Sequence, residues 1–112
     1  MYFRMAYIKV VKEEKIMSLM VVGADNLGSI KSNIESLGFD DIKHISGRKK
    51  SVFRSFKLPV NVDMVLVLTD YIHHSAMKKV KQEAKEKDVN VIFSRRSWAS
   101  IYKKMERRQL LN

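Results

Sequence analysis

The sequence is organised around a run of apolar residues at positions 62–70, Val-Asp-Met-Val-Leu-Val-Leu-Thr-Asp, which stops abruptly at Thr69 and Asp70. A strand with one face in solvent alternates apolar and polar residues, whereas this run is apolar on both faces. Such a strand is typical of the middle of a parallel sheet that helices cover on both sides. Because parallel α/β sheets bind ligands beyond the carboxyl ends of their strands, we expect a site at the polar end of this run.

Three more segments have strand patterns, and they alternate along the chain with helical patterns. The strands are expected at residues 18–22, 41–45 and 89–93, with the half-polar second strand at an edge of the sheet. The helices are predicted from apolar residues at helical spacing, namely Leu27, Ile30, Ile34 and Leu37, then Val52, Phe53 and Phe56, then Ala76, Met77, Val80 and Ala84, and finally Trp98, Ile101, Tyr102 and Met105. This alternation predicts an α/β fold class: a small three-layer Rossmann-like domain at residues 17–112, with a four-stranded parallel sheet of order 2-1-3-4 and helices on both faces.

Local signals predict where the helices begin and end. Asp25 or Asn26 is expected to cap the first helix, and Gly38 to follow its end. Pro59 ends the short second helix. Ser97 is the natural cap of the last helix, with Ser94 as the competing residue.

Residues 1–16 allow two interpretations. Their weak alternation is compatible with an extra edge strand. The segment Lys12-Glu13-Glu14 is, however, what a purine-rich bacterial ribosome-binding sequence encodes when it is read in frame, and Met17 follows shortly after. We therefore expect residues 1–16 to be an N-terminal extension upstream of the natural start.

Composition narrows the class of protein. At 112 residues the chain makes one domain, and without Cys it has no disulfide framework and no Cys-based metal site. No apolar run approaches the roughly 20 residues of a membrane span, and we expect a cytoplasmic protein without membrane contact. With 22 basic and 12 acidic residues, the net charge of +10 favours anionic partners, although lysines on solvated helix faces explain it equally well.

The chain resembles a bacterial family known only as domain of unknown function 2325. The resemblance rests on Val21-Val22-Gly23, on residues 35–38, on His44 with Gly47-Arg48, on the run at 65–77, and on Ser94-Arg95-Arg96-Ser97. It covers about residues 17–105 and implies a small Rossmann-like domain. It implies no activity and no catalytic residues. In the motif at 65–77 the chain departs from the family at His73, where we expect Ser or Asn.

The loop after the first strand carries glycines near the spacing of a phosphate-binding loop. Gly23 and Gly28 fit that spacing, but Ser29-Ile30 stands where a nucleoside-triphosphatase needs Lys and then Ser or Thr. The dinucleotide fingerprint is also absent, because Asp25 occupies its second glycine position. The alternative is that both glycines serve the turn and its packing.

Carboxylates and histidines suggest several kinds of site. Asp70 has the position to bind ribose hydroxyls, to hold Mg²⁺ together with Asp25, or to act as a base, and the competing role is to cap the next helix. His73 and His74 point in different directions, which makes them poor ligands for one metal. Either could bind a haem iron or donate to a phosphate, but a surface or capping role is favoured, and His44 is expected to be structural.

Basic residues are expected at two turns. Arg95 and Arg96 precede the last helix, where free N–H groups and the helix dipole would add to their charge, and we expect at least one of them to point into the crevice. Arg48 and the two lysines after it open the second helix. The alternative is that these are solvated side chains of loops.

These patterns predict a module that binds a phosphorylated small molecule or a nucleotide in a sensing or regulatory role. We expect it to form oligomers through the free edges of its sheet. The alternatives are a basic protein associated with nucleic acid, or a small hydrolase or transferase that uses Asp70. No catalytic residue, metal or cofactor is assigned. The candidate ligand-binding residues are Gly23, Asp25, Asn26, Arg48, Thr69, Asp70, His73, His74, Ser94, Arg95, Arg96 and Ser97.

Overall fold

The computed structural model describes residues 17–47 and 53–107, and these residues form one four-stranded sheet. The strands are β1 (Ser18–Val22), β2 (Asp41–Ile45), β3 (Met64–Leu68) and β4 (Asn90–Ser94). The helices are α2 (Ser29–Glu35), α4 (His74–Glu86) and α5 (Trp98–Arg107), and a short 3₁₀ turn, η1 (Thr69–Tyr71), follows β3. The predictions for residues 1–16, Arg48 and Val52 lie outside the described residues.

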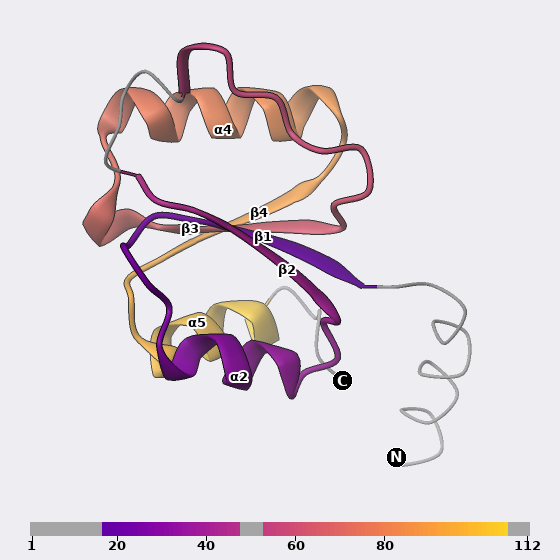
Figure 1. Cartoon of the computed structure of the whole chain (residues 1–112), viewed down its shortest axis with the longest axis vertical. Helices are drawn as coiled ribbons and strands as arrows, with labels where there is room; N and C mark the ends of the chain where they lie inside the picture. Colours follow the sequence, from indigo (N-terminus) through magenta and orange to yellow (C-terminus); the bar gives the residue numbers. More distant parts are fainter. Residues whose placement is uncertain (1–16, 48–52, 108–112) are drawn as a thin grey trace.

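The sheet has the predicted topology. All neighbouring strands are parallel and their order is β2-β1-β3-β4. One face of the sheet carries α4, and the other carries α2 and α5 (Figure 1). The α/β fold class and the strand order predicted from the sequence are therefore confirmed.

The apolar run that dominates the sequence forms the most buried part of the sheet. All five residues of β3 are at most 3% exposed, between β1 on one side and β4 on the other. Its alternate residues enter two separate cores: Leu66 and Leu68 pack on the face of α2 and α5, and Val65 and Val67 pack on the face of α4. A strand that contributes to both cores has no solvent face, which explains why its sequence does not alternate.

The first helix begins later than predicted. It starts at Ser29 after Gly28, which has a φ of +54°, and no side chain caps it, so the predicted capping by Asp25 or Asn26 is wrong. The reason is that Leu27 is buried in the turn before the helix, where its carbonyl accepts the Ile30 N–H at 3.0 Å. The apolar stripe thus begins two positions before the first helical residue.

The last helix has the cap that we predicted, but not all of the predicted apolar stripe is buried. The Oγ of Ser97 accepts the backbone N–H of Ser100 at 3.4 Å, which confirms Ser97 as the cap. Ile101 and Met105 are buried four residues apart on one line of the helix. Tyr102 lies beside that line and is 41% exposed, so its predicted inward position is wrong.

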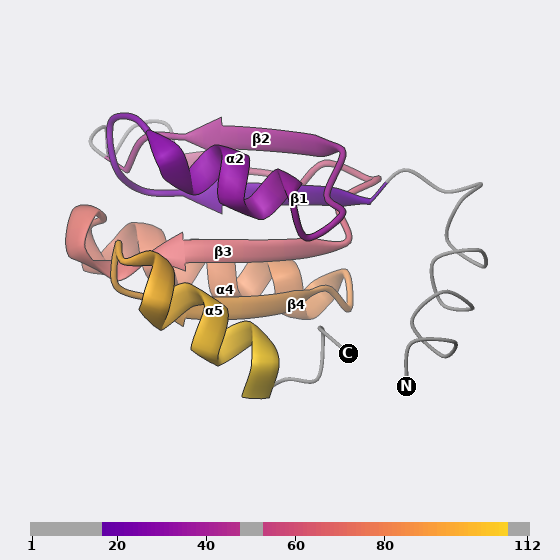
Figure 2. The ribbon, with the colours of Figure 1, turned by 90° about the horizontal axis from the view of Figure 1, so that it is seen from below.

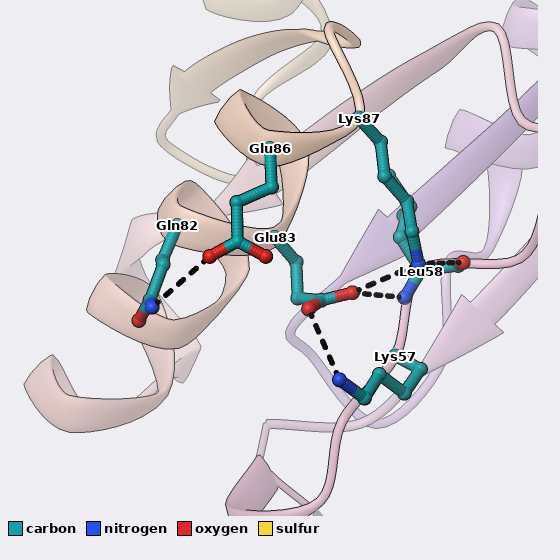
Figure 3. A network of polar contacts seen from close by, with 6 residues as sticks. All are labelled: Lys57, Leu58, Gln82, Glu83, Glu86 and Lys87. Atoms are coloured by element: carbon teal, nitrogen blue, oxygen red, sulfur yellow. Dashed lines mark hydrogen bonds and ion pairs between the residues drawn. The ribbon is translucent and has the colours of Figure 1, made fainter.

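Glu83, a buried glutamate on α4, forms a hydrogen bond with the segment that connects β2 to β3 (Figure 3). Glu83 is 3% exposed; its Oε1 accepts the backbone N–H of Leu58 at 2.9 Å and the ammonium of Lys87 at 3.2 Å. The same ammonium donates to the Leu58 carbonyl at 3.1 Å, and Lys57 lies 3.8 Å from the other carboxylate oxygen. The Leu58 N–H and Lys87 hold the pKa of Glu83 below its ordinary value, because both favour the charged carboxylate.

Candidate functional site

The carboxyl ends of the four strands lie at one edge of the sheet, and the candidate site is at this edge (Figure 2). After β1 ends, Gly23 turns the chain away with a φ of +113°, and its N–H donates to the Ile45 carbonyl at 2.8 Å. Beyond that turn, Gly47 and Ile72 form an isolated parallel bridge. The segments that follow β2 and β3 therefore meet past the end of β1.

Gly23 and Gly47 are required at this edge by close backbone contacts. A Cβ on Gly47 would lie 2.3 Å from the Tyr71 carbonyl oxygen, and a Cβ on Gly23 would lie 2.7 Å from the Leu68 carbonyl oxygen. No side chain fits at such distances without a backbone shift. This geometry gives Gly23 the turn and packing role that the sequence left as an alternative.

A pocket of about 390 Å³ opens at this edge. Its lining comes from three loops: Ala24 and Asp25 after β1, Gly47 after β2, and Tyr71, Ile72 and His73 between β3 and α4. It brings together two of the predicted site residues, Asp25 and His73. No pattern in the sequence indicated Ala24, Tyr71 or Ile72 as site residues, because their contribution depends on how the loops fold back.

The β1–α2 loop holds an unusual conformation beside the pocket. Ala24 is buried and has a φ of +68°, a left-handed conformation that residues with a Cβ adopt at a cost of about 1–2 kcal/mol. The imidazole of His44 supports this turn, since its Nε2 lies 2.8 Å from the Gly23 carbonyl oxygen and 3.0 Å from that of Ala24. Carbonyl oxygens only accept, so Nε2 carries the proton and donates to both. His44 therefore has the structural role that we expected.

The N-terminus of α4 lies beside the pocket. His73 is the N-cap residue of this 13-residue helix and also lines the pocket. No side chain forms a capping hydrogen bond there. A helix N-terminus presents backbone N–H groups and about half a positive charge, both of which favour an anion.

Asp70 does not cap α4, because the η1 turn separates it from the start of the helix. Its Oδ2 instead accepts the backbone N–H of Arg96 at 3.0 Å. The Arg96 guanidinium extends in turn to the β1–α2 loop, where Nη2 donates to the Asn26 carbonyl at 3.0 Å. Asp70, Arg96 and Asn26 thus connect three loops at the same edge.

The other predicted residues of this edge have different surroundings. Ser94 is 1% exposed; its hydroxyl donates to the Arg95 carbonyl at 2.9 Å, and its Oγ lies at hydrogen-bond distance, 3.0 Å, from the Ser100 Oγ. The Thr69 hydroxyl donates to the Ser94 carbonyl at 3.3 Å, which links the ends of β3 and β4. Arg95 and His74 are exposed, and neither is part of the pocket lining.

Residues 17–47 and 53–107 contain no group of three or more His, Cys, Asp or Glu side chains that could hold a metal ion. No helix in these ranges is long and apolar enough to cross a membrane.

The comparison with protein families identifies the chain. The family model DUF2325, described as an uncharacterized protein conserved in bacteria, matches residues 18–108. The chain belongs to the DUF2325 family. The match covers all four strands and every residue of the pocket lining, and it confirms the resemblance seen in the sequence. Searches of curated proteins and of solved structures gave no match to this DUF2325 protein.

Proposed function

We propose that this DUF2325 protein binds a small molecule with a phosphate and hydroxyl groups, such as a nucleotide, and that it acts as a sensing or regulatory module. The observation that carries this proposal is the N-terminus of α4, which adjoins the pocket through His73 and has no side-chain cap. Anions bind at such helix ends because several N–H groups and the helix dipole point toward them.

The rest of the pocket suits the other part of a nucleotide. The carboxylate of Asp25 accepts hydrogen bonds from hydroxyl groups and repels a phosphate, so it favours one orientation of the ligand. The Tyr71 side chain is 52% exposed and offers an aromatic face for a base. The volume of about 390 Å³ lies within the roughly 300–1,000 Å³ that is usual for small-molecule sites.

A binding role is favoured over chemistry by the form of the site. The pocket is open to solvent, whereas catalysis on phosphates benefits from the exclusion of water. The carboxylate of Asp70, the residue that an enzymatic role would use, accepts the Arg96 N–H and helps to position the β4–α5 loop. Arg96 in turn positions the β1–α2 loop through Asn26.

Isothermal titration calorimetry with AMP, adenosine and inorganic phosphate tests the proposal. We expect AMP to bind more tightly than adenosine, because adenosine lacks the group for the helix N-terminus. Asp25→Asn should weaken AMP binding about tenfold or more, since hydrogen bonds to charged groups contribute about 1.5–3 kcal/mol, but it should leave phosphate binding unchanged or stronger.

The matched control is Asp40→Asn, which removes an exposed carboxylate next to the amino end of β2, at the opposite edge of the sheet. This variant should bind AMP like the unmodified protein. Equal affinities for AMP and adenosine would contradict a phosphate site at α4. Equal losses in the Asp25 and Asp40 variants would remove the pocket as the binding site.

A further inference from the structure

Helix α4 carries a line of basic residues on its outer surface. The line consists of four residues spaced by four, three and four positions, namely His74, Lys78, Lys81 and Lys85. They lie within about 60° of the helix circumference. His74, Lys78, Lys81 and Lys85 are all exposed. The buried residues Ala76, Val80 and Ala84 are centred about 130° away, against the sheet. We call Lys78, Lys81 and Lys85 the lysine stripe.

The positive charge of the lysine stripe is not neutralised by its own helix. Glu83 is buried and bonded to Leu58 and Lys87 on the sheet side. Glu86 lies about 110° around the helix from the centre of the stripe. None of the three stripe lysines forms an ion pair within the described part of the chain.

Helix stability does not explain this arrangement. Like charges three or four residues apart on a helix repel one another and destabilise it. The stripe also leaves α4 more basic than α2, whose exposed face has one lysine, Lys31, and one glutamate, Glu35.

We propose that the lysine stripe binds the phosphate backbone of a nucleic acid, independently of the pocket. From His74 to Lys85 the line is about 16 Å long, and its neighbours are about 5–6 Å apart, so it spans several phosphates of one strand. Lysine binds phosphate as a point charge, and contacts to phosphates carry no sequence information, so the proposed binding is independent of sequence.

Other anionic partners fit this surface less well. A helix that lies in a membrane surface inserts an apolar face, and the apolar residues of α4 are buried against the sheet. Protein interfaces are enriched in arginine and aromatic residues and depleted in lysine. Nucleic acid is therefore the partner that a line of lysines on a polar face favours.

Fluorescence anisotropy of the full chain with labelled single-stranded and duplex oligonucleotides tests this proposal. The test variant changes Lys78, Lys81 and Lys85 together to Gln. The control variant changes Lys31, Lys103 and Arg107 to Gln, which removes the same charge from exposed positions on α2 and α5. Circular dichroism checks that both variants are folded.

We expect binding at about 50 mM salt that weakens steeply as salt rises. The stripe variant should lose affinity about tenfold or more and should make the plot of log K against log salt less steep by about two to three, since each phosphate contact contributes roughly 0.7–0.9. The control variant should change both quantities much less. Absence of binding at low salt, equal effects of the two variants, or a preference for anionic lipid vesicles over oligonucleotides would overturn the proposal.

Discussion

At the scale of single residues, the shape of the candidate site depends on a glycine and a histidine. The glycine lets two backbone segments come close together, and the histidine side chain supports a backbone turn. Gly47 permits the bridge to Ile72, and the His44 imidazole supports the left-handed turn at Ala24. His44 and Gly47 lie at least 20 residues along the chain from the residues that they contact. The role of His44 therefore follows from the parallel register of β1 and β2, and that of Gly47 from the bridge between the segments after β2 and β3; neither is visible in a local sequence pattern.

Glu83 gives a prediction at the same scale. Its folded-state pKa is lowered, so the carboxylate stabilises the fold at neutral pH, and this contribution disappears as the pH falls through the folded-state pKa. Glu83→Gln should lower the Tm at pH 7, and the difference from the unmodified protein should shrink as the pH falls below about 4. Thermal unfolding followed by circular dichroism from neutral to acid pH measures this.

The control for Glu83→Gln is Glu86→Gln. Glu86 lies three residues further along α4 and is exposed. Its Tm should stay close to that of the unmodified protein at every pH. A difference between the Glu83 variant and the unmodified protein that persists undiminished in acid would mean that the charge of Glu83 is not the source of the stabilisation.

At the scale of elements, most of the fold could be predicted. The positions that must be buried in a strand or a helix are apolar, and their spacing differs between the two. The strands at residues 18–22 and 41–45 match β1 and β2 at both ends, and β4 is shifted by one residue. The shift arises because the Val89 N–H donates to the Ala84 carbonyl at 2.8 Å and so belongs to the end of α4. The start of α2 could not be predicted, because Leu27 is buried in a turn that has the same spacing as the helix.

The burial of β3 gives a prediction for this scale. Leu66→Ala should lower the free energy of unfolding by about 2–5 kcal/mol, as large-to-small changes in a packed core do. Val60→Ala is the control, because Val60 is 92% exposed and its replacement should change stability by less than about 0.5 kcal/mol. Urea unfolding of the three proteins measures both values. A loss for Leu66→Ala as small as that of the control would contradict a core centred on β3.

At the scale of the whole molecule, a candidate site was predicted at the edge of the sheet where the pocket opens, but the residues that line the pocket could not be predicted. Parallel strands place Asp25, Asp70 and the β4–α5 loop at one edge whatever their side chains do. We expected the phosphate near Arg95 and Arg96, whereas the pocket adjoins α4 through His73. The difference arises because Asp70 and Asn26 bind Arg96, and because Gly47 meets Ile72 past the end of β1.

The most direct test of the proposed site is an NMR titration of the ¹⁵N-labelled protein with AMP. The largest shifts should fall on the backbone amides of the α4 N-terminus, His74, Ser75 and Ala76, and on the pocket residues Asp25 and Gly47. Amides at the amino edge of the sheet, such as Asp40, should not move. Shifts confined to the β4–α5 loop, or no shifts at millimolar AMP, would contradict a nucleotide site between the β1–α2 loop and α4.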